Sequence, residues 1–124
     1  MGILDGLLGN ASEIDIAKIQ DEFAPILGET ETIIQAYKVI RDMFVFTSAR
    51  LILVDKQGLT GKKVEYHSIP YKAITHFKVE TAGHFDLDAE LKIYISGEEQ
   101  VVSKELKKDS ALSIQKALAS GMFG

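Results

Sequence analysis

The sequence predicts an α+β fold in which a run of antiparallel strands is followed by one helix. From about residue 31 to residue 105, β-branched and aromatic residues alternate with turn signals at short intervals, which is typical of antiparallel strands. The residues before and after this region follow a helical spacing instead. With 124 residues and no internal repeat or linker, we expect one domain, made of an N-terminal helical extension (1–28) and a main body (29–124).

Two short helices are predicted in the extension. The first carries an apolar stripe formed by Ile3, Leu4, Leu7 and Leu8. The second is expected to start at a cap provided by Asn10 or Ser12 and to end at Pro25 and Gly28. It places Ile16, Ile19 and Phe23 on one face. Helices this short are marginal alone in water, so both stripes need a partner.

Seven strands are predicted in the main body. We place them near residues 31–40, 43–47, 50–55, 63–69, 75–81, 89–96 and 100–105. A final helix is expected from Asp109, as its N-cap, through Ala119, with Gly121 just past its end. Ala111, Ile114 and Leu118 would form its buried stripe.

Two strands differ from the rest because they are apolar on both faces. Residues 75–80 and 90–96 alternate between apolar and polar, as expected for strands with one face in water, whereas 43–46 and 51–54 do not alternate. If Phe44, Phe46, Leu51 and Leu53 face the core, the intervening side chains point outward and need cover from the N-terminal helices or from another subunit. The candidate oligomer or helix-docking surface consists of Met43, Val45, Ile52, Val54, Ile16, Ile19 and Phe23.

The stretches TSARLILVDKQGLTGKK (47–63) and IPYKAI (69–74) resemble the bacterial PH (pleckstrin-homology-like) domain family. The resemblance covers roughly residues 30–120. It implies a partly open β-barrel of about seven antiparallel strands in two sheets, closed by the C-terminal helix. It also implies a homo-oligomer, because bacterial members with an N-terminal helical extension are reported as ring-like assemblies. Eukaryotic PH domains bind phosphoinositides through basic residues in the first hairpin loop, but here that loop is Arg41-Asp42 with only Lys38 nearby.

The charge distribution argues against polyanionic partners. The net charge of −4 lies in residues 1–28, and the remaining residues are neutral by count. Proteins that bind nucleic acid or anionic lipid normally present a basic field, so we expect no nucleic acid partner and no strong anionic membrane binding. The absence of cysteine fits a reducing compartment, and the first nine residues lack the basic start of a secretory signal, so a cytoplasmic location is expected.

Three groups of residues are candidates for a chemical site. GLTGKK (58–63) has glycines and lysines like a phosphate loop, but the glycine spacing is too short, which favours a β-turn. Residues 84–88, which include His84 and Asp86, offer metal-ligand types without a fixed geometry, and His67 and His76 are expected at the surface. Asp42, Asp55, Asp86 and Glu90 lie at turns or strand ends, where carboxylates are commonly solvated.

The sequence therefore favours a non-enzymatic module that forms a homo-oligomer and serves as a protein-interaction or scaffold unit, with no cofactor. An alternative is a carrier or sensor of a small apolar or lipid ligand inside the barrel. That alternative needs a cavity, which bulky residues such as Phe44, Phe46, Phe77 and Leu91 are expected to fill.

Overall fold

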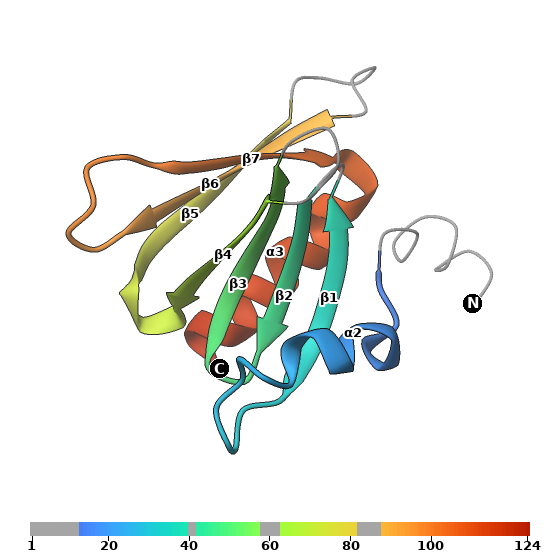
Figure 1. The fold of residues 1–124 in the computed structure, drawn as a ribbon. Coiled ribbons are helices and arrows are strands. Elements are labelled where there is room, and N and C mark those ends of the chain that lie inside the picture. Colours follow the sequence, from blue (N-terminus) through green and yellow to red (C-terminus); the bar gives the residue numbers. More distant parts are fainter. Residues whose placement is uncertain (1–12, 40–41, 58–62, 82–87) are drawn as a thin grey trace.

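The computed structural model describes residues 13–39, 42–57, 63–81 and 88–124, which form two antiparallel sheets with helices on opposite sides of the first sheet (Figure 1). The first sheet has the order β1 (Ile33–Val39), β2 (Asp42–Thr47), β3 (Arg50–Gln57) and β4 (Lys63–Pro70). The second has the order β5 (Ile74–Thr81), β6 (Asp88–Ile95) and β7 (Val102–Lys107). A short 3-10 turn, η1 (Tyr71–Ala73), joins the sheets, and the helices are α2 (Ile16–Phe23) and α3 (Lys108–Phe123).

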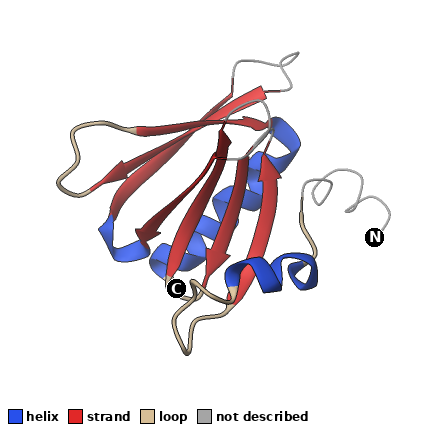
Figure 2. Cartoon of the chain, in the orientation of Figure 1, coloured by secondary structure: helices blue, strands red, loops and turns tan. Residues whose placement is uncertain are grey.

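This architecture confirms the predicted fold class. The seven strands pair antiparallel in two sheets that do not close into a barrel, and α3 packs on the inner face, as Figure 2 shows by secondary structure. The strands begin and end within about two residues of the predicted bounds.

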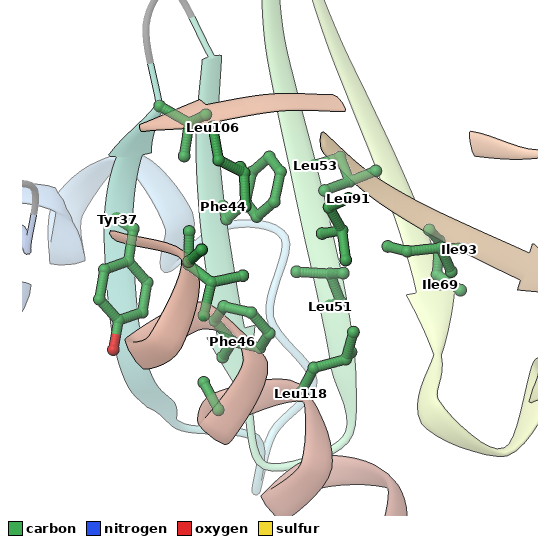
Figure 3. Packing of buried hydrophobic residues seen from close by; sticks show 14 of the residues in the cluster. Tyr37, Phe44, Phe46, Leu51, Leu53, Ile69, Leu91, Ile93, Leu106 and Leu118 are labelled. Atoms are coloured by element: carbon green, nitrogen blue, oxygen red, sulfur yellow. The ribbon is translucent and has the colours of Figure 1, made fainter. Parts of the chain in front are cut away.

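The core lies between the two sheets and α3. Figure 3 shows Phe44 and Phe46 of β2 beside Leu51 and Leu53 of β3, pointing toward α3 and the second sheet as predicted. The fully buried side chains of this cluster include Tyr37, Phe44, Phe46, Leu51, Ile69, Leu91, Ile93, Leu106, Ile114 and Leu118. The Tyr37 and Phe46 rings meet edge to face, with centroids 6.0 Å apart. Bulky side chains therefore fill the space between the sheets.

β1 does not follow a simple alternation. Its pairing with β2 shifts register between Ile33 and Gln35, which is a β-bulge. Tyr37 faces the core, whereas Ile33 and Ala36 both pack on the opposite face of the sheet. The bulge leaves Ile34 with 54% of its surface exposed.

The predicted start of the second helix is wrong. α2 begins at Ile16, and its N-cap is Asp15, whose Oδ1 accepts a hydrogen bond from the Ala17 amide at 3.1 Å. Glu13 and Ile14 are extended, because the Ile14 amide donates to the Ala36 carbonyl at 2.8 Å and adds a short antiparallel bridge to the edge of β1. The first predicted helix, with Ile3, Leu4, Leu7 and Leu8, and the two proposed caps lie outside the described residues.

The predicted ends of the last helix are also wrong. α3 begins at Lys108 without a side-chain cap. Asp109 lies in its first turn, where a carboxylate interacts favourably with the positive end of the helix dipole. Gly121 lies inside the helix and not past its end. The physical reason is the Tyr71 ring, because a Cβ at Gly121 would lie only 2.4 Å from Tyr71 Cε1.

Tyr71 joins three parts of the fold. Its ring packs on α3, and its hydroxyl donates a buried hydrogen bond to the Thr47 carbonyl at 2.7 Å. Burial, with a smaller effect of the nearby Glu31 charge, raises the pKa of Tyr71 to about 12. The corner between the sheets, formed by Ile69, Pro70 and Tyr71, is therefore held against both α3 and the end of β2.

We expect Gly121→Ala to destabilise the protein by about 1–3 kcal/mol, because the added methyl group overlaps the Tyr71 ring and forces the corner to move. Urea unfolding measures the change. Ser120→Ala, at the neighbouring exposed position of α3, is the matched control and should change stability by less than about 0.5 kcal/mol. Equal stabilities for the two variants would show that the ring and the helix are not in tight contact.

Candidate interaction surfaces

The first surface is the outer face of the first sheet, which α2 covers (Figure 1). Ile19 and Phe23 of α2 are buried in one cluster with the outward side chains of β2 and β3, and Ile16 packs against this cluster. The structure thus brings together all seven residues of the predicted surface: Met43, Val45, Ile52, Val54, Ile16, Ile19 and Phe23. Both faces of β2 and β3 are therefore covered within a single chain.

Polar contacts fix the position of α2. The Phe23 and Tyr66 rings meet edge to face with centroids 5.9 Å apart, and the Tyr66 hydroxyl donates to Glu22 Oε2 at 2.9 Å. That carboxylate, together with burial, raises the pKa of Tyr66. The sequence pattern did not predict a role for Tyr66, which looks like an ordinary outward residue of an edge strand.

A partly buried ion pair anchors the segment that follows α2. Arg50 Nε donates to Glu31 Oε2 at 2.8 Å, and Nη2 donates both to Glu31 Oε1 at 3.0 Å and to the Ile26 carbonyl at 2.7 Å. Nη1 donates to Ser68 Oγ on β4 at 2.9 Å. One guanidinium therefore links the end of the extension, the start of the main body and the edge of the first sheet.

The turn between β2 and β3 positions this arginine. Thr47 Oγ1 accepts hydrogen bonds from the amides of Ala49 and Arg50, and the hydroxyl donates to Glu31 Oε2 at 2.5 Å. The Gly28 amide donates to Glu31 Oε1 at 2.9 Å. We call Glu31, Thr47 and Arg50 the Glu31–Arg50 hub.

The positive charge of Arg50 stabilises the ionised form of Glu31 in the hub. The Arg50 hydrogen bond lowers the pKa of Glu31 to about 2, against the opposing effect of burial, and the bonds from Gly28 and Thr47 lower it further. Only 9% of the Glu31 side chain is exposed, so solvent screens the pair weakly. The charged form of Glu31 is therefore strongly favoured in the folded protein.

The second surface is a groove between β1 and the C-terminal half of α3, with a volume of about 710 Å³. We call it the β1–α3 groove. Its walls include Ile34, Gln35 and Tyr37 of β1 and Lys116 and Ser120 of α3. On α3, Leu112 and Phe123 stand beside this wall by helical spacing and are 76% and 73% exposed. The sequence pattern does not indicate this groove, because residues on two separate elements create it.

The outer face of the second sheet is charged and internally paired. Lys92 Nζ lies 2.8 Å from Glu80 Oε1, and the resulting hydrogen bond lowers the pKa of Glu80 and raises that of Lys92. His76 stacks on Tyr94 with ring centroids 4.1 Å apart. Lys92 Nζ also lies 3.8 Å from Glu90 Oε1, so this lysine is shared between carboxylates of β5 and β6.

The chemical sites considered from the sequence do not assemble in the described part of the chain. His67 and His76 are exposed as predicted, and no group of three metal-ligating side chains is present among the described residues. His84, Asp86 and residues 58–62 of the GLTGKK segment lie outside the described residues.

The carboxylates considered for catalysis have local partners. Burial raises the pKa of Asp42, although Lys104 Nζ lies 3.4 Å from Asp42 Oδ2. Asp55 lies opposite Asp42 on the neighbouring strand β3. Glu90 accepts a hydrogen bond from Ser103 Oγ at 2.5 Å.

Among the described residues, no helix is long and apolar enough to cross a membrane.

Because of the Glu31–Arg50 hub, we expect the folded protein to lose stability at acidic pH. Because the pKa of Glu31 is lower in the folded chain than its ordinary value of 4.5, its contribution is complete above that pH and is lost as the pH falls toward 2. The shift corresponds to a contribution on the order of 3 kcal/mol. Urea unfolding at pH 7 and pH 3 should show Glu31→Gln destabilised at pH 7, with a smaller difference from wild type at pH 3.

The control for this experiment is Glu80→Gln. The pKa of Glu80 is also lowered, but its ion pair with Lys92 is exposed, so this variant should follow the wild-type pH profile. If Glu31→Gln also follows that profile, the hub does not stabilise the fold.

Docking of α2 predicts a large effect of Ile19→Asp. The change buries an unpaired carboxylate against Val45 and Ile52, so we expect a loss of roughly 3 kcal/mol or detachment of the helix. Gln20→Asp, at the adjacent exposed position, is the control. Urea unfolding and limited proteolysis report the two effects, and equal behaviour of both variants would show that α2 is not held on the sheet.

Comparison with known proteins agrees with this fold. The model of the family described as bacterial PH domain matches residues 2–122. The uncharacterised protein YjqA of Bacillus subtilis (strain 168) is 61% identical over 122 residues, covering 97% of this chain and 98% of that protein.

Two solved structures are similar over most of the chain. A pleckstrin homology domain from Shewanella amazonensis SB2B is 60% identical, with a TM-score of 0.86, and the match covers 99% of this chain and 100% of that one. A protein with a pleckstrin-homology domain from Shewanella loihica PV-4 is 57% identical, with a TM-score of 0.80, over 90% of this chain and 97% of that one. On the matched sequence, the two-sheet architecture and the capping helix, the chain belongs to the bacterial PH domain family.

Proposed function

We propose that this protein is a non-enzymatic PH-like module that forms a homo-oligomer and serves as a protein-interaction or scaffold unit. The observation that carries the proposal is the β1–α3 groove, which Ile34, Leu112 and Phe123 flank with largely exposed apolar side chains. Apolar side chains gathered beside a groove are a common mark of a protein-binding site.

The reason for assembly differs from the one that the sequence suggested. Outward residues of β2 and β3, such as Val45 and Ile52, are fully buried under α2 of the same chain, so they do not require a second subunit. The groove is separate from that face, since it opens on the side of α3. A partner therefore has to gain its contacts at the groove, where burial of each large apolar side chain contributes about 1.5–3 kcal/mol.

The carrier alternative has weaker support. Side chains from both sheets and α3, among them Phe44, Phe46 and Leu91, fill the space between the sheets (Figure 3). A ligand inside the barrel would have to displace them, at the cost of a close-packed core. The groove is open and lined by polar as well as apolar groups, which suits a protein segment better than an isolated apolar molecule.

We further propose that neither nucleic acid nor anionic lipid is a partner, and that the protein acts in the cytoplasm. The charge of the chain supports this view, because the excess of carboxylates lies in residues 1–28 and the main body is neutral by count. On the described face of the second sheet, Lys92 and Lys107 pair with carboxylates and are not free to form a basic patch.

Light scattering on a sizing column tests the assembly. We expect the wild-type chain to run as a multimer at micromolar concentration, and the double variant Leu112→Asp/Phe123→Asp to weaken association at least about tenfold, because it places charges beside the groove. Val101→Asp, at another exposed apolar position, is the control. A wild-type mass equal to that of one chain at every concentration would overturn the proposal.

A further inference from the structure

We propose that the β1–α3 groove of one copy binds the N-terminal segment, residues 1–12, of a neighbouring copy. This inference rests on the proposed homo-oligomer and names the contact that forms it. The interacting parts are the apolar stripe of Ile3, Leu4, Leu7 and Leu8 on one chain and the groove on the next.

The segment needs an apolar partner outside the face that α2 occupies. Its four large apolar residues stand at helical spacing, and a helix of this length is not stable alone in water. The sheet face under α2 has no room for it, since Val45, Ile52 and Val54 are 0% exposed. Among the described residues, the β1–α3 groove is the hollow flanked by large exposed apolar side chains.

The charges of the two parts are complementary. Lys116 is the cationic side chain of the groove wall, and no carboxylate among the described residues forms an ion pair with it. Asp5 is the one charged side chain in residues 1–12 and lies in the middle of the apolar stripe. A carboxylate placed between apolar residues fits a groove that combines Tyr37 and Ile34 with a single lysine.

The strand direction at Glu13 favours a neighbouring copy over the same chain. Glu13 pairs with Tyr37 antiparallel, so the short extended stretch of Glu13 and Ile14 has its N-terminal end toward the Val39 end of β1. The groove extends the other way, toward Thr47 and the C-terminal Gly124, at the end of the sheet where β1 begins (Figure 1). To enter its own groove, the segment would have to reverse direction within a few residues.

Cross-linking between two differently labelled chains tests the contact. The natural sequence has no cysteine, so Leu7→Cys in one chain and Ser120→Cys in another introduce unique thiols on the segment and on the groove wall. After mixing and subunit exchange, a short bis-maleimide should join the two chains at least about tenfold more than it joins Leu7→Cys to the control Glu98→Cys, which lies in an exposed turn.

The outcomes separate this inference from the proposed function. A wild-type monomer by light scattering overturns both. A multimer in which Leu7→Cys and Ser120→Cys do not cross-link above the control overturns the inference alone. A chain carrying both cysteines that cross-links only to itself, without a gain in mass, also overturns it because the segment then binds its own groove.

A charge exchange provides a second test that needs no cross-linker. Lys116→Glu should weaken association at least about tenfold, and Asp5→Lys in the same chain should restore it, since the ion pair re-forms with opposite signs. Glu98→Lys paired with Lys116→Glu is the control for net charge. If the control restores assembly equally well, the effect is one of overall charge and Asp5 does not meet Lys116.

Discussion

The Glu31–Arg50 hub is the interaction on which the arrangement of the rest depends. Arg50 begins β3, Glu31 precedes β1, and the Ile26 carbonyl follows α2, so a single guanidinium holds three chain segments at fixed distances. Because Glu31 is nearly buried and accepts hydrogen bonds from Arg50, Thr47 and Gly28, neither charge is left unsatisfied, which is the condition under which a buried pair can stabilise a fold. The path of the chain from α2 into β1 is thereby set.

That path decides which surface is free for partners. With its exit fixed by the hub, α2 lies across β2 and β3 and buries Ile19 and Phe23 against them. The apolar face that could have driven association is then used for folding within one chain. The proposed association would have to use apolar surface that the fold leaves exposed, and among the described residues the groove beside Ile34 and Phe123, on the opposite side of the sheet, offers such surface.

The fold could be predicted from the sequence because alternation, turn residues and helical spacing are local signals. They failed where a contact between distant elements changed the local outcome. Gly121 suggested a helix end, but the approach of Tyr71 from the corner between the sheets explains it. The bulge in β1 places Ile33 on the face that α2 covers, and because Ile14 pairs with the edge of β1, the helix begins only at Ile16, after the cap Asp15. The predicted surface residues come together in one cluster, whereas the groove could not be found because its walls are far apart in sequence.

The two parts of the proposed contact lie on different surfaces of the chain, which constrains the assembly that they can build. A segment that leaves one copy near Glu13 and enters the groove of the next forms a heterologous contact, since the donor and acceptor surfaces differ. Such contacts generate a ring when the rotation between copies closes and a filament when it does not. Only residues 9–12 separate the apolar stripe from Glu13 and Ile14, which pair with β1, and a connection of so few residues would restrict that rotation and favour closure with a fixed number of subunits.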